Sequence, residues 1–357
     1  MPGSGTNYIV AVSIPFTVGV VAAALLPLEG ESYLWPALCS SAGLFPALFL
    51  ICRKGNGRTV VPAVFFLLGF LSYCSSSICG GLSATDIPAS GKLLERLTTF
   101  IDSAGFTSDS TAALLKALLT GQKRAMGQET VAVFRESGAS HILALSGLHL
   151  GIIYGIMSKA LSVLGQSRAA TVARSVILIA ASGFYVLMTG ASASLVRAFL
   201  FICVNEVAGN APGRRKSPLT AFCIAITIQL SVNPQAIESV SFQLSYLAML
   251  GILTIYPLLE EWYPSGKGIL RRIWNSIAMS VSCQIFTAPV VWYHFHTFPK
   301  YFIITNLVAL PLTEALIISS VTSLCAEALG ICPEILKGLC DTLAQALIYC
   351  LEAIATI

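Results

Sequence analysis

Long apolar runs separated by short polar turns occupy most of the chain. A helix needs about 20 predominantly apolar residues to cross a bilayer, and eleven runs approach or exceed that length. They lie at about residues 8–27, 34–52, 60–82, 140–163, 169–190, 192–209, 218–232, 241–259, 273–293, 302–327 and 335–356. The pattern therefore predicts an all-α fold, a polytopic transmembrane helical bundle of about ten or eleven spans.

Residues 91–138 interrupt this pattern with shorter helices. In the first of them, Lys92 to Ala104, apolar side chains share one face and charged side chains lie elsewhere. Such an amphipathic helix is expected to lie in the outer membrane–water interface, and the alternative is packing against the bundle. The chain thus divides into an N-terminal three-helix membrane segment, 1–82, and a second membrane domain, 91–357, with interfacial helices at 91–138.

The apolar run from Ser140 to Val163 is predicted as a single helix with one polar face. At about 100° per residue, three polar side chains fall within roughly 140° of each other; they are His141, Ser146 and His149. Polar side chains at membrane depth usually face a bundle interior or a wet cavity. We therefore expect this helix to line the working cavity of the protein.

Glycines form the opposite face of the same predicted helix. They recur every fourth residue, at Gly147, Gly151 and Gly155. Small residues at this spacing allow two membrane helices to approach closely. The spacing predicts a groove in which a neighbouring helix packs.

Three further polar residues occur inside apolar runs. Arg197 is either a buried cation that faces an anion pathway or an arginine that snorkels to the outer surface. Gln243 is expected to form a hydrogen bond either with another helix or with a ligand. Asn306 precedes Pro311, and Pro289 lies in the preceding span; two such prolines predict interrupted helices around a cavity, or simple kinks.

Composition and charge agree with a membrane protein. Charged residues make up 11% of the chain, whereas soluble proteins carry about 25%. Basic loops at 53–58, 210–217 and 260–272 place those loops and the N-terminus in the cytoplasm by the positive-inside rule. The basic residues of 91–138 are the exception, and they are a candidate first contact for a polyanion. The net charge of +4 is too small to predict a DNA-binding surface by itself.

Sequence motifs for catalysis and metal binding are sparse. The cysteines form no paired CxxC pattern, and His294 and His296 have no third ligand at short spacing. A-L-S-G at 144–147 is a weak match to the nucleophile motif of rhomboid intramembrane proteases, with His149, His294 or His296 as the available base. The N-terminus lacks a basic n-region and a cleavage site, so the first run is expected to be a retained helix.

The run from Glu136 to Gly151, E-S-G-A-S-H-I-L-A-L-S-G-L-H-L-G, resembles the signature of the ComEC competence family, the inner-membrane channel for transforming DNA. Further matches follow in the order of that family. They are A-L-L-T-G-Q-K at 117–123, the span with Arg197, N-P and S-F-Q-L-S-Y within 233–246, and N-L-V-A-L-P at 306–311. The resemblance covers about residues 91–315.

This resemblance implies that 91–357 is a competence-type channel domain of a bacterial cytoplasmic (inner) membrane. Its implied activity is the conduction of single-stranded transforming DNA into the cytoplasm. Since the chain has no complete metal-nuclease motif, we expect no catalysis, metal or cofactor. The positions that it assigns to the substrate path are His141, Ser146, His149, Arg197, Gln243 and Asn306.

The chain departs from the family pattern in two places. Many members carry an OB-fold domain where this chain has the linker 82–91, and many end in a metallo-β-lactamase-like nuclease domain with an H-x-H-x-D-H motif. This chain is therefore expected to be the membrane domain alone. It also lacks a G-x-x-x-x-G-K-[ST] motif. A DNA-binding competence protein, a nuclease and a cytoplasmic helicase motor are expected as separate partners, besides single-stranded DNA and membrane lipid.

Two other functions stay open from the residues alone. A secondary transporter for a small anion would use the same cavity around Arg197. An intramembrane serine protease would use Ser146 as its nucleophile.

Overall fold

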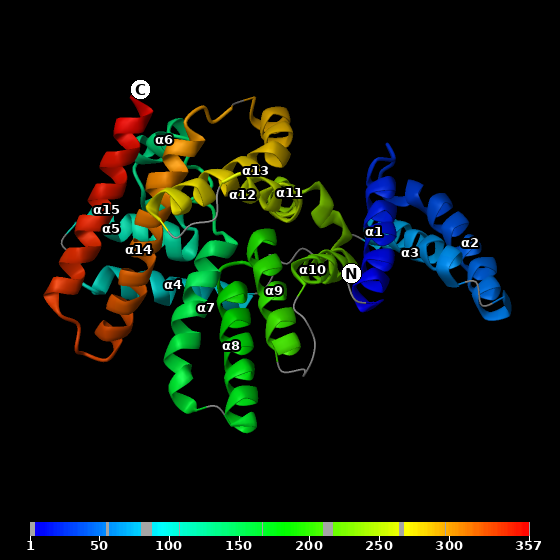
Figure 1. Cartoon of the computed structure of the whole chain (residues 1–357), viewed down its shortest axis with the longest axis horizontal. Helices are drawn as coiled ribbons and strands as arrows, with labels where there is room; N and C mark the ends of the chain where they lie inside the picture. Colours follow the sequence, from blue (N-terminus) through cyan, green and yellow to red (C-terminus); the bar gives the residue numbers. More distant parts are fainter. Residues whose placement is uncertain are drawn as a thin grey trace. The chain divides into compact units, whose positions relative to one another are not determined.

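The computed structural model describes residues 4–54, 57–79, 88–106, 108–165, 167–209, 217–263, 268–296 and 298–356. Over these residues the chain forms α-helices joined by loops and short 3₁₀ turns, and no strand (Figure 1). The predicted all-α fold is confirmed.

Most predicted spans correspond to helices with similar boundaries. These are α1 (Ser4–Ala24), α2 (Leu34–Lys54), α3 (Gly57–Cys79), α7 (Gly147–Leu161), α8 (Arg168–Met188), α9 (Ala193–Gly209), α10 (Pro218–Val232), α11 (Val240–Thr254) with α12 (Tyr256–Glu261), α13 (Ile269–Phe295), α14 (Phe302–Ala328) and α15 (Glu334–Ala355).

Seven helical segments in the described part of the chain are long and apolar enough to cross a membrane. Two shorter apolar helices accompany them, Tyr8–Ala24 and Pro218–Val232. The chain is therefore a multi-pass membrane protein. The total of ten or eleven spans and the cytoplasmic N-terminus stay predictions.

Two of the long helices continue through a proline. Pro289 lies inside α13 and Pro311 inside α14, and both helices are continuous around them. The freed carbonyl before a proline is tolerated in a membrane helix where neighbouring groups satisfy it. The prediction of interrupted helices at these two prolines is therefore wrong.

The chain forms two compact units, and each is described by itself. The first combines Met1–Thr85 with Leu200–Tyr246, and the second combines Asp86–Phe199 with Leu247–Ile357. The predicted division at residues 82–91 stays a prediction.

Close helix contacts hold the first unit together. A Cβ added to Gly19 on α1 would collide with the backbone of Phe66, and one on Gly69 of α3 would collide with the backbone of Phe16. Glycine at these two positions therefore lets α1 and α3 pack backbone to backbone.

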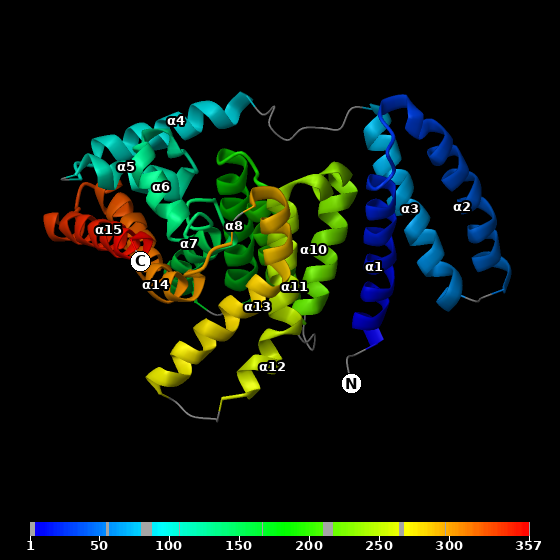
Figure 2. The same ribbon diagram turned by 90° about the horizontal axis from the view of Figure 1, so that it is seen from above.

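In the second unit a single apolar core lies between α5 (Asp109–Thr120), α14 and α15. Figures 1 and 2 both show α14 and α15 side by side, with α5 and α6 (Gln128–Glu136) next to them. Its fully buried side chains come from these helices and from the loop after α6; they include Leu115, Leu118, Phe134, Ile142, Leu316, Ile317 and Leu347. This core fixes the loop that carries the candidate site.

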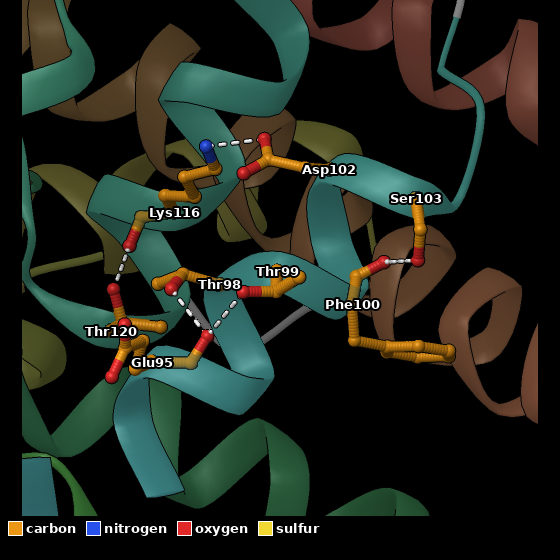
Figure 3. A network of polar contacts seen from close by, with 8 residues as sticks. All are labelled: Glu95, Thr98, Thr99, Phe100, Asp102, Ser103, Lys116 and Thr120. Carbon is orange, nitrogen blue, oxygen red and sulfur yellow. Dashed lines mark hydrogen bonds and ion pairs between the residues drawn. The ribbon is translucent and has the colours of Figure 1, made fainter. Parts of the chain in front are cut away.

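The amphipathic helix predicted at 92–104 is α4 (Pro88–Ser103). Its apolar face packs on the core, because Ile101 is buried there, Phe100 contacts the same cluster and Ala104, just after the helix, is also buried in it. Asp102 forms an ion pair with Lys116 of α5 (Figure 3). The structure thus shows the bundle-packed alternative for this end of α4, and its placement at the membrane surface stays a prediction.

Candidate functional site

The candidate site begins with the loop between α6 and α7, residues 137–146. Ala139, Ile142 and Leu143 of this loop are buried in the apolar core, while His141 and Ala144 are exposed. The buried residues anchor the loop in the apolar core, and the exposed His141 is presented on its surface. The predicted helix over 140–146 is wrong, because this segment is irregular and α7 begins at Gly147.

The start of α14 holds the same loop by polar and close contacts. The buried Thr305 hydroxyl donates a 2.6 Å hydrogen bond to the carbonyl oxygen of Ser137. Gly138 has a φ of +79°, and a Cβ added there would lie 2.9 Å from Cβ of Pro299. Glycine is required at 138 because the positive φ and the contact with Pro299 both exclude a side chain.

His141 and Asn306 are brought together by this packing. His141 Nδ1 lies 3.2 Å from the carbonyl oxygen of Gly138, and the Asn306 side chain reaches the same ring. Desolvation by the surrounding protein atoms lowers the pKa of His141, and the hydrogen bond to the Gly138 carbonyl acts in the opposite direction. Asn306 Nδ2 also donates to Ser280 Oγ of α13 at 3.2 Å.

Ser146 and His149 form the N-terminal cap of α7. Ser146 Oγ accepts from the backbone N–H of Leu148 at 3.2 Å, and His149 Nδ1 accepts from the backbone N–H of Ser146 at 3.2 Å. His149 is 1% exposed. Both side chains thus satisfy the start of the helix. The described bond of His149 Nδ1 goes to a backbone N–H and not to the Ser146 hydroxyl, so nothing in this geometry favours the protease alternative.

Arg197 on α9 lies beside the first turn of α7. Its Nη2 is 3.6 Å from a Cβ placed on Gly147, and Cys283 of α13 lies within range of its charge. Nε of the guanidinium is buried. The Arg197 side chain is half-buried and its guanidinium lies beside the first turn of α7. The choice between a cavity-facing and a snorkelling arginine stays a prediction.

The predicted glycine groove is occupied at one end. Gly147 contacts α9, since a Cβ there would lie 3.1 Å from Cβ of Ala198. Nothing lies within 4 Å of the Cβ positions of Gly151 and Gly155 in the described part of the chain. The two outer positions thus face open space, and a role for them in helix packing stays a prediction.

Gln243 lies in the first unit, on α11. Its Nε2 donates to the carbonyl oxygen of Ile237 at 2.9 Å, which stabilises the turn before its own helix. Tyr246 of this unit likewise has a structural contact, since its hydroxyl donates to Gln229 Oε1 at 2.9 Å.

One turn of α13 connects the polar groups of the second unit. Ser280 on this turn accepts from Asn306, which reaches His141, and Cys283 on the same turn interacts with Arg197. We call these groups the polar cluster: His141, Arg197, Ser280 and Asn306, with the Ser146–His149 cap at its edge. Sequence reasoning missed Ser280 and Thr305, because single hydroxyls are ordinary residues in an apolar span.

Comparison with known proteins shows to which family the chain belongs. A family profile described as Competence protein matches residues 118–357, which includes every member of the polar cluster. The chain belongs to the competence protein family. The resemblance that the sequence motifs carried is therefore confirmed.

Two curated relatives match parts of this competence family chain. "ComE operon protein 3" of Bacillus subtilis (strain 168) is 27% identical over 203 residues, which are 57% of this chain and 25% of that protein. "Uncharacterized protein YcaI" of Escherichia coli (strain K12) is 24% identical over 209 residues, 56% of this chain and 27% of that protein. The matched parts thus span about a quarter of each relative. No solved structure matches the chain.

Proposed function

We propose that this chain forms the membrane conduit through which single-stranded DNA enters a naturally competent cell. The family match supports a role in DNA uptake, and the polar cluster supports the finer assignment. Within a multi-pass bundle, the half-buried Arg197 of α9, His141 of the loop 137–146 and the Asn306 amide of α14 provide groups that attract phosphate. A strand of phosphates needs such a wet path with weak, repeated contacts.

Arg197 is the observation that carries the proposal. A charged side chain inside a membrane segment is expensive and usually marks a substrate or ion path. The Arg197 guanidinium lies beside Gly147 of α7, and its Nε is buried. The cluster would also suit a small anion, and the test below separates the two substrates.

The test is transformation in the natural host with the altered chain as its source of this protein. Arg197→Gln is expected to reduce uptake of labelled single strands at least tenfold, with the protein still present in the membrane. Arg197→Lys keeps partial uptake if the residue acts as a point charge, and fails if the planar guanidinium is needed. The matched control is Arg168→Gln, which removes the same charge at an exposed position.

Normal strand uptake by Arg197→Gln would contradict the conduit. Loss of small-anion uptake with normal transformation would favour the transporter instead.

The proposal gives the chain no catalytic step. A DNA-binding competence protein, a nuclease and a cytoplasmic helicase motor act as separate partners, and the chain lies in the cytoplasmic membrane with its N-terminus inside. Purified chain should leave linear DNA intact with Mg²⁺ or Mn²⁺ added. Metal-dependent degradation by the purified chain, absent from a mock preparation, would contradict this part.

A further inference from the structure

Exposed aromatic side chains are concentrated where α13 ends and the chain turns toward α14. Trp292 is 59% exposed, Tyr293 76%, Phe295 56% and Phe298 49%. Exposed His294, His296 and Lys300 are interleaved with them. We call the residues 292–296 and 298–300 the aromatic rim.

The aromatic rim adjoins the polar cluster. Pro299 of the rim packs against Gly138 of the loop 137–146. Directly after the rim, Thr305 bonds Ser137 and Asn306 reaches His141. The rim therefore borders the loop that presents His141, and it belongs to the same unit as the cluster.

The chemistry of the rim fits an unpaired nucleic acid strand. Proteins that bind single strands combine aromatic faces, on which bases stack, with cations that contact the backbone. Lys300 in the rim and the exposed Arg135, three residues before Gly138, supply the cations, with Glu136 as the one neighbouring acid in that stretch. The histidine nitrogens add hydrogen-bonding groups.

We propose that the aromatic rim is a stacking platform that binds the unpaired bases of single-stranded DNA before the strand reaches the polar cluster. This proposal rests on the proposed conduit function and adds a binding site to it. The competing occupant is lipid, because tryptophan and tyrosine also form belts at membrane interfaces. The interleaved histidines, the lysine and the contact with the polar loop favour nucleic acid.

Binding of an oligothymidylate to the purified chain in detergent tests the platform. Trp292→Ala is expected to weaken binding on the order of tenfold, as removal of one stacking partner does. Tyr293→Ala should also weaken it, and Tyr293→Phe should not, because phenylalanine keeps the stacking face. The matched control is Trp262→Ala after α12, since Trp262 is 74% exposed and lies on the predicted cytoplasmic side.

Tryptophan fluorescence separates the two occupants. The protein is placed in bilayer discs, and the fluorescence of the Trp292→Phe variant is subtracted from that of the unaltered chain. The difference is the emission of Trp292. We expect oligothymidylate to quench it, and brominated lipid to quench it less than it quenches the remaining tryptophans. Quenching by brominated lipid without quenching by the oligonucleotide would overturn the platform.

The platform and the conduit can fail separately. Unchanged oligothymidylate affinity in Trp292→Ala would overturn the platform. If Arg197→Gln then still blocked uptake, the conduit would stand without it.

Discussion

At the scale of single residues, the site depends on buried backbone groups that side chains satisfy. Ser137 is buried at the end of α6, and Thr305 of α14 donates a hydrogen bond to its carbonyl oxygen. An unsatisfied buried acceptor costs about 1–3 kcal/mol. Thr305 is therefore a positioning residue for the loop that presents His141.

This gives a first prediction about stability. Thr305→Val should lower the free energy of unfolding by about 1–3 kcal/mol, because the buried Ser137 carbonyl loses its donor. Thr305→Ser keeps the hydroxyl and should be close to the unaltered chain. The measurement is thermal unfolding in detergent, with Thr322→Val as control, because Thr322 is exposed and bonds only its own helix. Equal effects of Thr305→Val and Thr322→Val would refute the assigned role.

Sequence alone identified some of these residues and not others. His141, Arg197 and Asn306 are costly in an apolar run, so their presence there indicates a role in the site. Ser280 and Thr305 could not be recognised, because a hydroxyl in a membrane helix usually bonds its own preceding turn, as Thr305 also does with Tyr301. Their partners come from distant parts of the chain, which only the fold reveals.

At the scale of elements, the first turn of α7 organises the site. Ser146 and His149 cap the helix, and Gly147 allows Ala198 and Arg197 of α9 to approach closely. The hydropathy pattern predicted a helix here, as observed, but began it at Ser140 and not at Gly147. The reason is that the loop 137–146 is nearly as apolar as the helix. The irregular backbone there is set by contacts with α14, which hydropathy does not report.

The cap leads to a second prediction. Ser146→Ala should cost about 1 kcal/mol, as loss of an N-cap does, and should also reduce uptake, because the first turn beside Arg197 loosens. Ser167→Ala is the matched control: Ser167 caps α8 by accepting from Ala170 N–H at 3.1 Å, away from the polar cluster. It should lose similar stability and keep uptake. Equal uptake by both variants would show that the cap is only structural.

At the scale of the whole molecule, the uptake of a strand from outside requires one orientation of the protein in the membrane. The loops at 53–58, 210–217 and 260–272 are predicted to be cytoplasmic, and the aromatic rim is predicted to lie outside, where DNA arrives. Single cysteines in each loop, in a chain without its native cysteines, should stay unlabelled by an impermeant reagent in intact cells. Lys300→Cys in the rim should be labelled, since Lys300 is exposed. Labelling of two of the three loops would reverse the orientation.

The most direct test of the central claim is photo-cross-linking of DNA during uptake. A photoreactive residue at Ala144, which is exposed beside Ser146, should form adducts with labelled transforming DNA. The same residue at Tyr349, which is 73% exposed on α15, should form none, because that face is predicted to contact lipid. Both variants must retain uptake. Adducts at position 349 equal to those at 144, or uptake without adducts at 144, would contradict passage of the strand along the polar cluster.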